Sequence, residues 1–265
     1  MRNGIDEIKK WINKNGYPLE MFTSKIFKKN NFEVAQSLYY KDINTEKYRE
    51  IDILAHKCLF INKVSLNISF VIECKKSDKP WVIFSDNNSS NIKYLKNEIF
   101  SSINAKILIN EIQKNKIKSK LINPNISTCG YNIAVAFNEK SDTAYSATQS
   151  VLSACNFLVD ESNKSKNRYI NLYFPIIVID TNLFISNLDE NLELNVEEVN
   201  DFIIYNSKSF DDSKLNLISV VTKNKLHEYV QNLSEEISLF FKNYNTEINL
   251  ITSNHPTNAH IKIVN

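Results

Sequence analysis

The sequence predicts an α/β fold with a mixed central sheet flanked by helices. Amphipathic segments with helical spacing alternate with short segments rich in β-branched and aromatic residues. Two of the latter, residues 68–74 and 170–180, are almost wholly apolar, as expected for strands that are buried on both faces. The chain has 265 residues, 43% apolar and 23% charged, a composition that favours a folded core over a disordered chain.

The N-terminal third predicts two short helices followed by three strands. The first helix, over residues 4–14, carries its apolar residues at helical spacing, namely Ile5, Ile8, Trp11 and Ile12. Gly16 ends it, and Pro18 suits the first turn of a second helix that runs to about Lys29. Three strands follow, at Phe32–Tyr40, Glu50–Ala55 and Ile68–Cys74. Residues 41–48 and 56–66 are polar enough to form hairpin-type connections between these strands.

The remainder of the chain predicts more strands and two longer helices. Residues 85–91 favour a loop, and residues 92–121 favour one or two helices. Further strands are predicted at Tyr131–Phe137, Ile170–Asp180, Val199–Tyr205 and Leu215–Val221. Pro175 favours an edge position or a bend in the second of these, because proline cannot donate a ladder hydrogen bond. Amphipathic helices are predicted over Ala144–Leu158, capped by Ser141 or Asp142, and over Leu226–Tyr244.

Composition excludes several functional classes. Its few glycines, Gly4, Gly16 and Gly130, form neither a dinucleotide-binding fingerprint nor a P-loop. The four cysteines form no C-x-x-C pair and no zinc spacing, which indicates reduced thiols. The N-terminus has no apolar signal region, and no stretch approaches the ~18 apolar residues of a membrane span. We therefore expect a cytoplasmic protein that makes no membrane contact.

The net charge of +2 conceals an uneven distribution along the chain. Residues 1–140 carry 23 Lys and Arg against 14 Asp and Glu, a balance of +9. Residues 141–265 carry 9 against 16, a balance of −7. A basic half indicates a polyanionic partner, although lysine is also a common solubilising residue.

One acid-x-lysine triplet, Glu73-x-Lys75, is distinguished by its position. Triplets of this pattern begin at Glu7, Glu73 and Asp212, a frequency that composition alone explains. Only the second ends a buried apolar strand. Residues i and i+2 of a strand project from the same face, so Glu73 and Lys75 point together and Cys74 points to the other side.

A second acid is expected beside this pair. Asp52 lies in the preceding predicted strand, within reach of Glu73 if the two strands form a hairpin. Two converging carboxylates repel each other, and a hard divalent cation such as Mg²⁺, which prefers oxygen ligands, removes that repulsion. Lys75 beside the metal can stabilise charge on a phosphate or orient the attacking water. Metal-assisted phosphodiester hydrolysis requires these parts.

At this point the sequence resembles the PD-(D/E)xK, or restriction-endonuclease-like, nucleases, most closely their Mrr-like and bacterial defence-associated members. The resemblance is carried by GYPLEMF, REIDILA and FVIECKKSDKPW, which lie within residues 16–81. It implies an αβββαβ core with Asp52 and Glu73 as metal ligands and Lys75 as the catalytic lysine. Glu20 matches the acid on the first helix, which assists metal or water binding. Mg²⁺ is the implied cofactor, and Mn²⁺ is expected to substitute for it.

The resemblance also implies a division of the chain. A single nuclease domain spans residues 1–265, with its core at about 16–81 and 131–181. Residues 82–130 are then an insertion, and residues 185–265 a C-terminal extension of strands and a helix. Some relatives carry Gln-x-x-x-Tyr on the crossover helix. Here Tyr145 and Gln149 occur in the opposite order, so neither is assigned a role.

Each local signal has a structural alternative. Glu73 and Lys75 could form an exposed salt bridge at a strand end, and Glu20 could serve only the helix dipole. Lys76 and Lys79 could contact phosphate or belong to a solvated turn. The same choice applies to the alternating lysines at Lys114, Lys116, Lys118 and Lys120. Trp81 and Phe84 fit a core better than a base-stacking role, and His56 is the histidine nearest the cluster in sequence.

The expected function is that of a Mg²⁺-dependent DNA endonuclease in bacterial restriction or anti-phage defence. Its targeting would come from a homodimer or from a partner protein, because no separate sequence-reading domain is evident. Two alternatives remain open. A nuclease fold can bind nucleic acid or a protein without cleaving, and the same metal chemistry acts equally on RNA.

Overall fold

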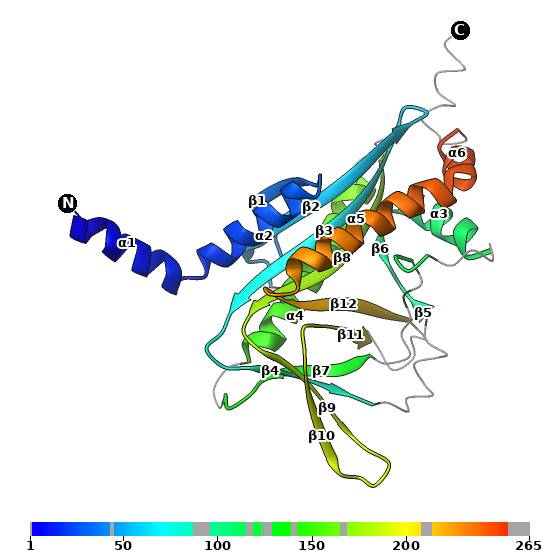
Figure 1. Ribbon diagram of the computed structural model, residues 1–265. Helices are drawn as coiled ribbons and strands as arrows, with labels where there is room; N and C mark the ends of the chain where they lie inside the picture. Colours follow the sequence, from blue (N-terminus) through cyan, green and yellow to red (C-terminus); the bar gives the residue numbers. More distant parts are fainter. Residues whose placement is uncertain are drawn as a thin grey trace.

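The computed structural model describes residues 2–42, 45–86, 96–114, 119–122, 124, 129–138, 142–164, 169–207 and 214–253. The helices are α1 (Arg2–Lys14), α2 (Tyr17–Lys29), α3 (Ile103–Lys114), α4 (Thr143–Lys164), α5 (Leu226–Asn243) and α6 (Asn245–Ser253). The first strands are β1 (Glu33–Lys41), β2 (Tyr48–Ile61), β3 (Val64–Lys76), β4 (Trp81–Ser85), β5 (Lys96–Asn97) and β6 (Phe100–Ser101). The later strands are β7 (Gly130–Val135), β8 (Tyr169–Asp180), β9 (Leu183–Leu188), β10 (Leu194–Val199), β11 (Asp201–Ser207) and β12 (Lys214–Thr222). The predicted α/β class is confirmed (Figure 1).

The strands of the described residues join in one mixed sheet, whose main path is β1-β2-β3-β8-β12-β11-β7-β4-β9-β10. Strands β1, β2 and β3 form an antiparallel meander. Strand β8 lies parallel to β3 along its whole length, from Ser65↔Tyr169 to Lys76↔Asp180. The helix α4 lies between β3 and β8 in sequence and packs against both strands. The elements α2, β1, β2, β3, α4 and β8 thus occur in this order, but β4, β5, β6, α3 and β7 lie between β3 and α4 in sequence.

The hairpin between β2 and β3 is longer than the sequence suggested. Residues 56–66 were expected to form a loop, but the ladder continues to the pair Ile61↔Val64, and only Asn62 and Lys63 make the turn. Both have positive φ, 50° and 62°. A two-residue turn of this kind matches the twist of the flanking strands, so the hairpin can close tightly. Residues 56–66 include His56, Lys57, Asn62, Lys63 and Ser65, and this polar content explains why a loop was predicted.

Pro175 was expected to mark an edge position or a bend, but it lies in a strand with neighbours on both sides. On one side of β8 it pairs with Val71 of β3. On the other side, β6 pairs with β8 at Leu172 and Tyr173, and β12 pairs only from Ile176 onward. Pro175 thus falls where β8 exchanges one neighbour for the next. No ladder partner requires an N–H there, which is why the sheet tolerates proline.

Residues 82–128 also differ from the prediction. Strand β4 precedes the expected loop of residues 85–91 and was not predicted. Within residues 92–121, where one or two helices were expected, lie two short strands and the helix α3. Strand β4 pairs antiparallel with β7 and parallel with β9, so Trp81–Ser85 belongs to the sheet. Residues 87–95, 115–118 and 125–128 lie outside the described residues, as does Ser141. Asp142 caps α4 as expected, because its Oδ1 accepts the N–H groups of Ala144 and Tyr145 at 2.9 and 3.3 Å.

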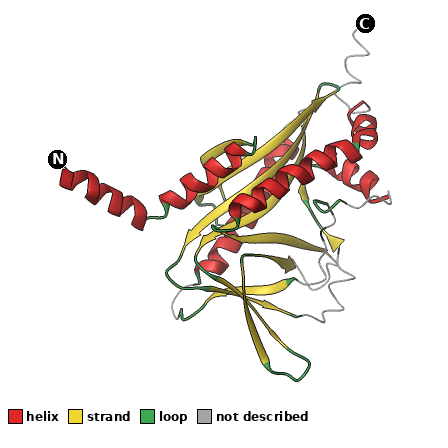
Figure 2. Cartoon of the chain, viewed as in Figure 1, coloured by secondary structure: helices red, strands yellow, loops and turns green. Residues whose placement is uncertain are grey.

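Two hydrophobic cores lie on the two faces of the sheet. On one face, Phe27 of α2, Leu108 of α3 and Phe240 of α5 pack on the side of the sheet that carries Phe70 and Ile72. On the other, α4 packs on Val71, Ile177 and the β4–β7 pair. Figure 2 shows α5 in front of the sheet and α4 behind it. None of the helices in the described part combines the length and apolar character that a membrane span requires.

Candidate active site

The carboxylate of Asp52 is turned toward the backbone of the neighbouring strand. The ladder of β1 with β2 contains Gln36↔Ile53 and Leu38↔Ile51 but skips Asp52. The ladder of β2 with β3 likewise starts at Ile53↔Ile72. Ser37, which would oppose Asp52 on β1, has a φ of 55°, a left-handed conformation that is uncommon for serine and that interrupts the ladder. Released from regular pairing, Asp52 accepts the Cys74 N–H at its Oδ2, at 2.7 Å.

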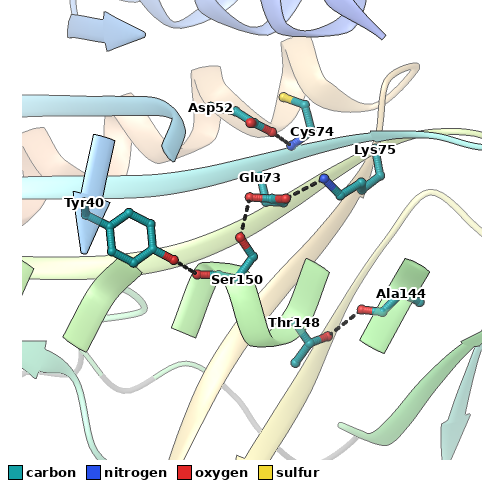
Figure 3. Close-up of polar contacts among 8 residues, drawn as sticks. All are labelled: Tyr40, Asp52, Glu73, Cys74, Lys75, Ala144, Thr148 and Ser150. Atoms are coloured by element: carbon teal, nitrogen blue, oxygen red, sulfur yellow. Dashed lines mark hydrogen bonds and ion pairs between the residues drawn. The ribbon is translucent and has the colours of Figure 1, made fainter. Parts of the chain in front are cut away.

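Glu73 and Lys75 point together, as the strand period requires. The Lys75 Nζ lies 2.5 Å from Oε1 of Glu73, and the side chains are 31% and 9% exposed. The second carboxylate oxygen of Glu73 accepts a hydrogen bond from Ser150 Oγ of α4 at 3.1 Å. In Figure 3, Glu73, Lys75 and Ser150 lie below the ribbon of β3, while Asp52 and Cys74 lie above it. The tip of β3 thus carries acid on both of its sides.

Helix α2 adds a third acid. Glu20 lies in its first turn. Burial, followed by the nearby charges of Asp52 and Glu50, raises the pKa of Glu20 from 4.5 to about 7. Lys75 acts in the opposite direction and Glu73 in the same one. All three predicted acids therefore interact electrostatically with one another and with the predicted lysine.

The pKa values of Glu73 and Asp52, the two acids that lie on strands, are also raised. Burial and then the charge of Asp52 raise the pKa of Glu73, against the lowering effect of Lys75. Burial also raises the pKa of Asp52, although the Cys74 N–H and Lys75 lower it. For Lys75, burial lowers the pKa, but Glu73 and Asp52 outweigh burial and the net shift is upward. Among the described residues, Lys75 is the cation that acts on all three acids, and their negative charge favours its protonated form.

The donor set suits a hard divalent cation. Carboxylate oxygens are the ligands that Mg²⁺ prefers, and added positive charge would relieve the raised pKa values of Glu20, Asp52 and Glu73. Two features run against a site fully formed for metal. Lys75 and Ser150 engage both oxygens of Glu73. Among the described residues, no three His, Cys, Asp or Glu side chains lie close enough together to hold an ion.

The other basic residues singled out from the sequence make structural contacts. Lys76 Nζ donates to the carbonyl of Asn13 at 2.9 Å, and Lys79 Nζ donates to that of Phe137. His56 Nε2 lies 3.1 Å from Oε2 of Glu33, and the two residues are paired in the β1–β2 ladder. Lys114 and Lys120 form ion pairs with Glu111 and Glu236, while Lys116 and Lys118 lie outside the described residues. The predicted core role of Trp81 is confirmed, since its side chain is fully buried.

Three further residues, Ser150, Tyr40 and Glu50, contact or act on the cluster and were not predicted. Ser150 orients Glu73 from α4, and Tyr40 in turn donates to the Ser150 carbonyl at 3.3 Å. No sequence signal marks a contact that spans 77 residues. Glu50 raises the pKa of both Glu20 and Asp52. Its spacing of two from Asp52 in the predicted strand was a signal that could have identified it.

Comparison of the chain with protein-family models, with curated proteins and with solved structures finds no match.

Proposed function

We propose that the chain is a metal-dependent endonuclease that hydrolyses DNA phosphodiester bonds, acting in bacterial restriction or anti-phage defence. The carrying observation is the group at the tip of β3. There a charged lysine contacts Glu73, Asp52 is held on the next backbone N–H, and Glu20 approaches from α2. Burial of like charges around a single cation is costly for stability, and perturbed pKa values of this kind are concentrated at functional sites.

Each residue has a distinct part in the proposed reaction. Asp52 and Glu73 would hold Mg²⁺, which supplies charge neutralisation for a phosphate. Lys75 stabilises negative charge on the scissile phosphate. Glu20, with a pKa of about 7, can accept a proton from an attacking water near neutral pH. Ser150 holds the Glu73 carboxylate in place through its hydroxyl.

The order of the elements supports the same proposal. The elements α2, β1, β2, β3, α4 and β8 occur in this order, with β4, β5, β6, α3 and β7 between β3 and α4. Strands β1–β3 are antiparallel, and β8 is parallel to β3. This is the succession that the nuclease resemblance implies. The acids occur on α2, β2 and β3, which are the elements to which the resemblance assigns them.

A plasmid-nicking assay tests the proposal. Supercoiled plasmid is incubated with wild type and with Lys75→Ala, each with Mg²⁺, with Mn²⁺ and with a chelator. Nicking by wild type with either metal, and its loss in the variant or with chelator, supports the enzyme. Equal nicking by both proteins indicates a contaminant. No nicking by either contradicts the proposal.

One observation favours the alternative in which the protein binds without cleaving. Lys75 and Ser150 already engage both carboxylate oxygens of Glu73. A competition assay with labelled duplex DNA, single-stranded RNA and duplex RNA separates the remaining possibilities. Preferred cleavage of RNA would identify a ribonuclease. Binding of nucleic acid without cleavage under any metal condition would identify a binding module.

A further inference from the structure

Helix α1 exposes an apolar stripe. Ile5, Ile8 and Trp11 lie at helical spacing and are 57–59% exposed. The contacts of the described residues that attach α1 to the body of the protein lie at its C-terminal end. Lys76 binds the Asn13 carbonyl, and the Trp11 ring lies 5.8 Å from that of Tyr17. Figure 1 shows the rest of α1 projecting away from the sheet.

An exposed apolar stripe leaves an isolated helix with little stabilisation. Helices of about 12–15 residues or fewer are marginal in water, and most helical stability in proteins comes from packing of the apolar face. Helix α1 has 13 residues. Its stripe does not end with the helix, because Tyr17 and Met21 of α2 continue it and are also exposed. A contiguous exposed apolar surface of this kind marks an interaction site.

The charges beside the stripe indicate which partner fits. Glu7 and Lys14 are seven residues apart, so they flank the same side of the stripe. Two copies of α1 packed antiparallel bring the same flank of each helix together. Glu7 of one copy then lies beside Lys14 of the other, and the two-fold symmetry repeats this pair. Ile8 of each copy packs against Ile12 of the other in the same register.

We propose that α1 is a homodimerisation helix that pairs antiparallel with α1 of a second copy of this chain. The exposed isoleucines and Trp11 supply the apolar core of the interface, and the Glu7–Lys14 pairs fix its direction. Tyr17 and Met21 extend the contact onto α2. The proposal is independent of the nuclease activity.

Analytical ultracentrifugation of the full chain over a wide concentration range tests the proposal. Wild type is expected to sediment as a dimer. Ile8→Glu places a charge in the interface of both copies and is expected to raise the dissociation constant at least about 30-fold. Leu192→Glu, at an exposed leucine between β9 and β10, is the control and leaves the dimer unchanged. Circular dichroism verifies that every variant is folded.

A charge exchange tests the antiparallel direction. Glu7→Lys alone and Lys14→Glu alone each set like charges against each other and weaken the dimer. An equimolar mixture restores opposite charges at both pairs and is expected to re-form it as a heterodimer. A monomeric wild type, a dimer insensitive to Ile8→Glu, or a mixture no tighter than its components overturns the proposal. A monomer that co-sediments with anionic vesicles would assign the stripe to a lipid surface instead.

Discussion

Two acid–lysine pairs of nearly equal length show how little a short distance says by itself. In α3, Glu111 and Lys114 approach to 2.6 Å with their side chains 34% and 69% exposed. In β3, Glu73 and Lys75 approach to 2.5 Å with 9% and 31% exposed. Water screens the first pair, so it contributes about 0–0.5 kcal/mol. The second is largely desolvated, and the charges of Asp52 and Glu20 act on it as well. Surroundings, not spacing, separate a surface pair from a candidate site.

The largest expected difference is in activity. Glu73→Gln removes a charge from the site and is expected to lower the rate of plasmid nicking about 10²–10³-fold. Glu111→Gln, the matched change in the exposed pair, is expected to leave the rate unchanged. Single-turnover nicking with Mg²⁺ measures both. If the two variants lost activity equally, the contrast between the pairs would have no functional meaning.

Removal of Asp52, the acid beside the Glu73–Lys75 pair, should lower the free energy of unfolding. Asp52→Ala leaves the Cys74 N–H without its acceptor, at an expected cost of about 2–3 kcal/mol, reduced somewhat by relief of repulsion with Glu73. Asp160→Ala, at an exposed position on α4, is expected to change the unfolding free energy by less than about 0.5 kcal/mol. Urea unfolding gives both values. A gain of stability in Asp52→Ala would mean that repulsion dominates.

The hydrogen bond from Ser150 of α4 to Glu73 also distinguishes the two pairs. Among the described residues, no residue of another element is shown to bind Glu111 in this way. Ser150→Ala removes the hydroxyl that holds Glu73 and is expected to cost about 1–2 kcal/mol of unfolding free energy. Ser146→Ala, one turn earlier and exposed, is the control. Loss of activity in Ser150→Ala should appear mainly in kcat, since the residue positions Glu73 and does not bind substrate. An unchanged kcat would remove Ser150 from the site.

The smallest effect is a pH dependence. Folded Glu20 keeps its proton up to about pH 7, whereas the unfolded chain releases it near 4.5. The folded state therefore binds more protons between these values, and stability falls as pH rises through this window. Glu20→Gln abolishes that dependence. Above pH 7, Glu20→Gln is expected to have a larger unfolding free energy than wild type. Because Glu20 is partly exposed, solvent screening limits this difference to about 1 kcal/mol. Urea unfolding of both proteins from pH 4.5 to 8 measures it, and parallel curves would contradict the assignment.

Much of the site followed from local periodicity. The strand period alone places Glu73 with Lys75 and Cys74 opposite, and the hairpin brings Asp52 alongside. The orientation of Asp52 could not be predicted, because it depends on the left-handed backbone of Ser37 in another strand. The role of Ser150 could not be predicted from the sequence either, because its contact with Glu73 joins residues 77 apart in the chain.

The same division holds for the fold. Strands with continuous apolar runs were found, and so was the Asp142 cap, which acts within one turn. The far half of β2 and the partners of β4 were missed. Strand pairing across long sequence separations carries no local signature, and polar residues such as His56, Lys57 and Lys63 resemble a loop when the second strand is unknown.

The pairing of β4 has a consequence for synthesis of the chain. Trp81 pairs with Leu183, and its N–H binds the Asn182 carbonyl. On the ribosome, β4 therefore emerges well before the strand that will cover its edge. At about 5–20 residues per second, a gap of roughly a hundred residues leaves this apolar segment waiting for about 5–20 s. Slowed translation would lengthen that interval and with it the risk of aggregation through the unpaired strand edge.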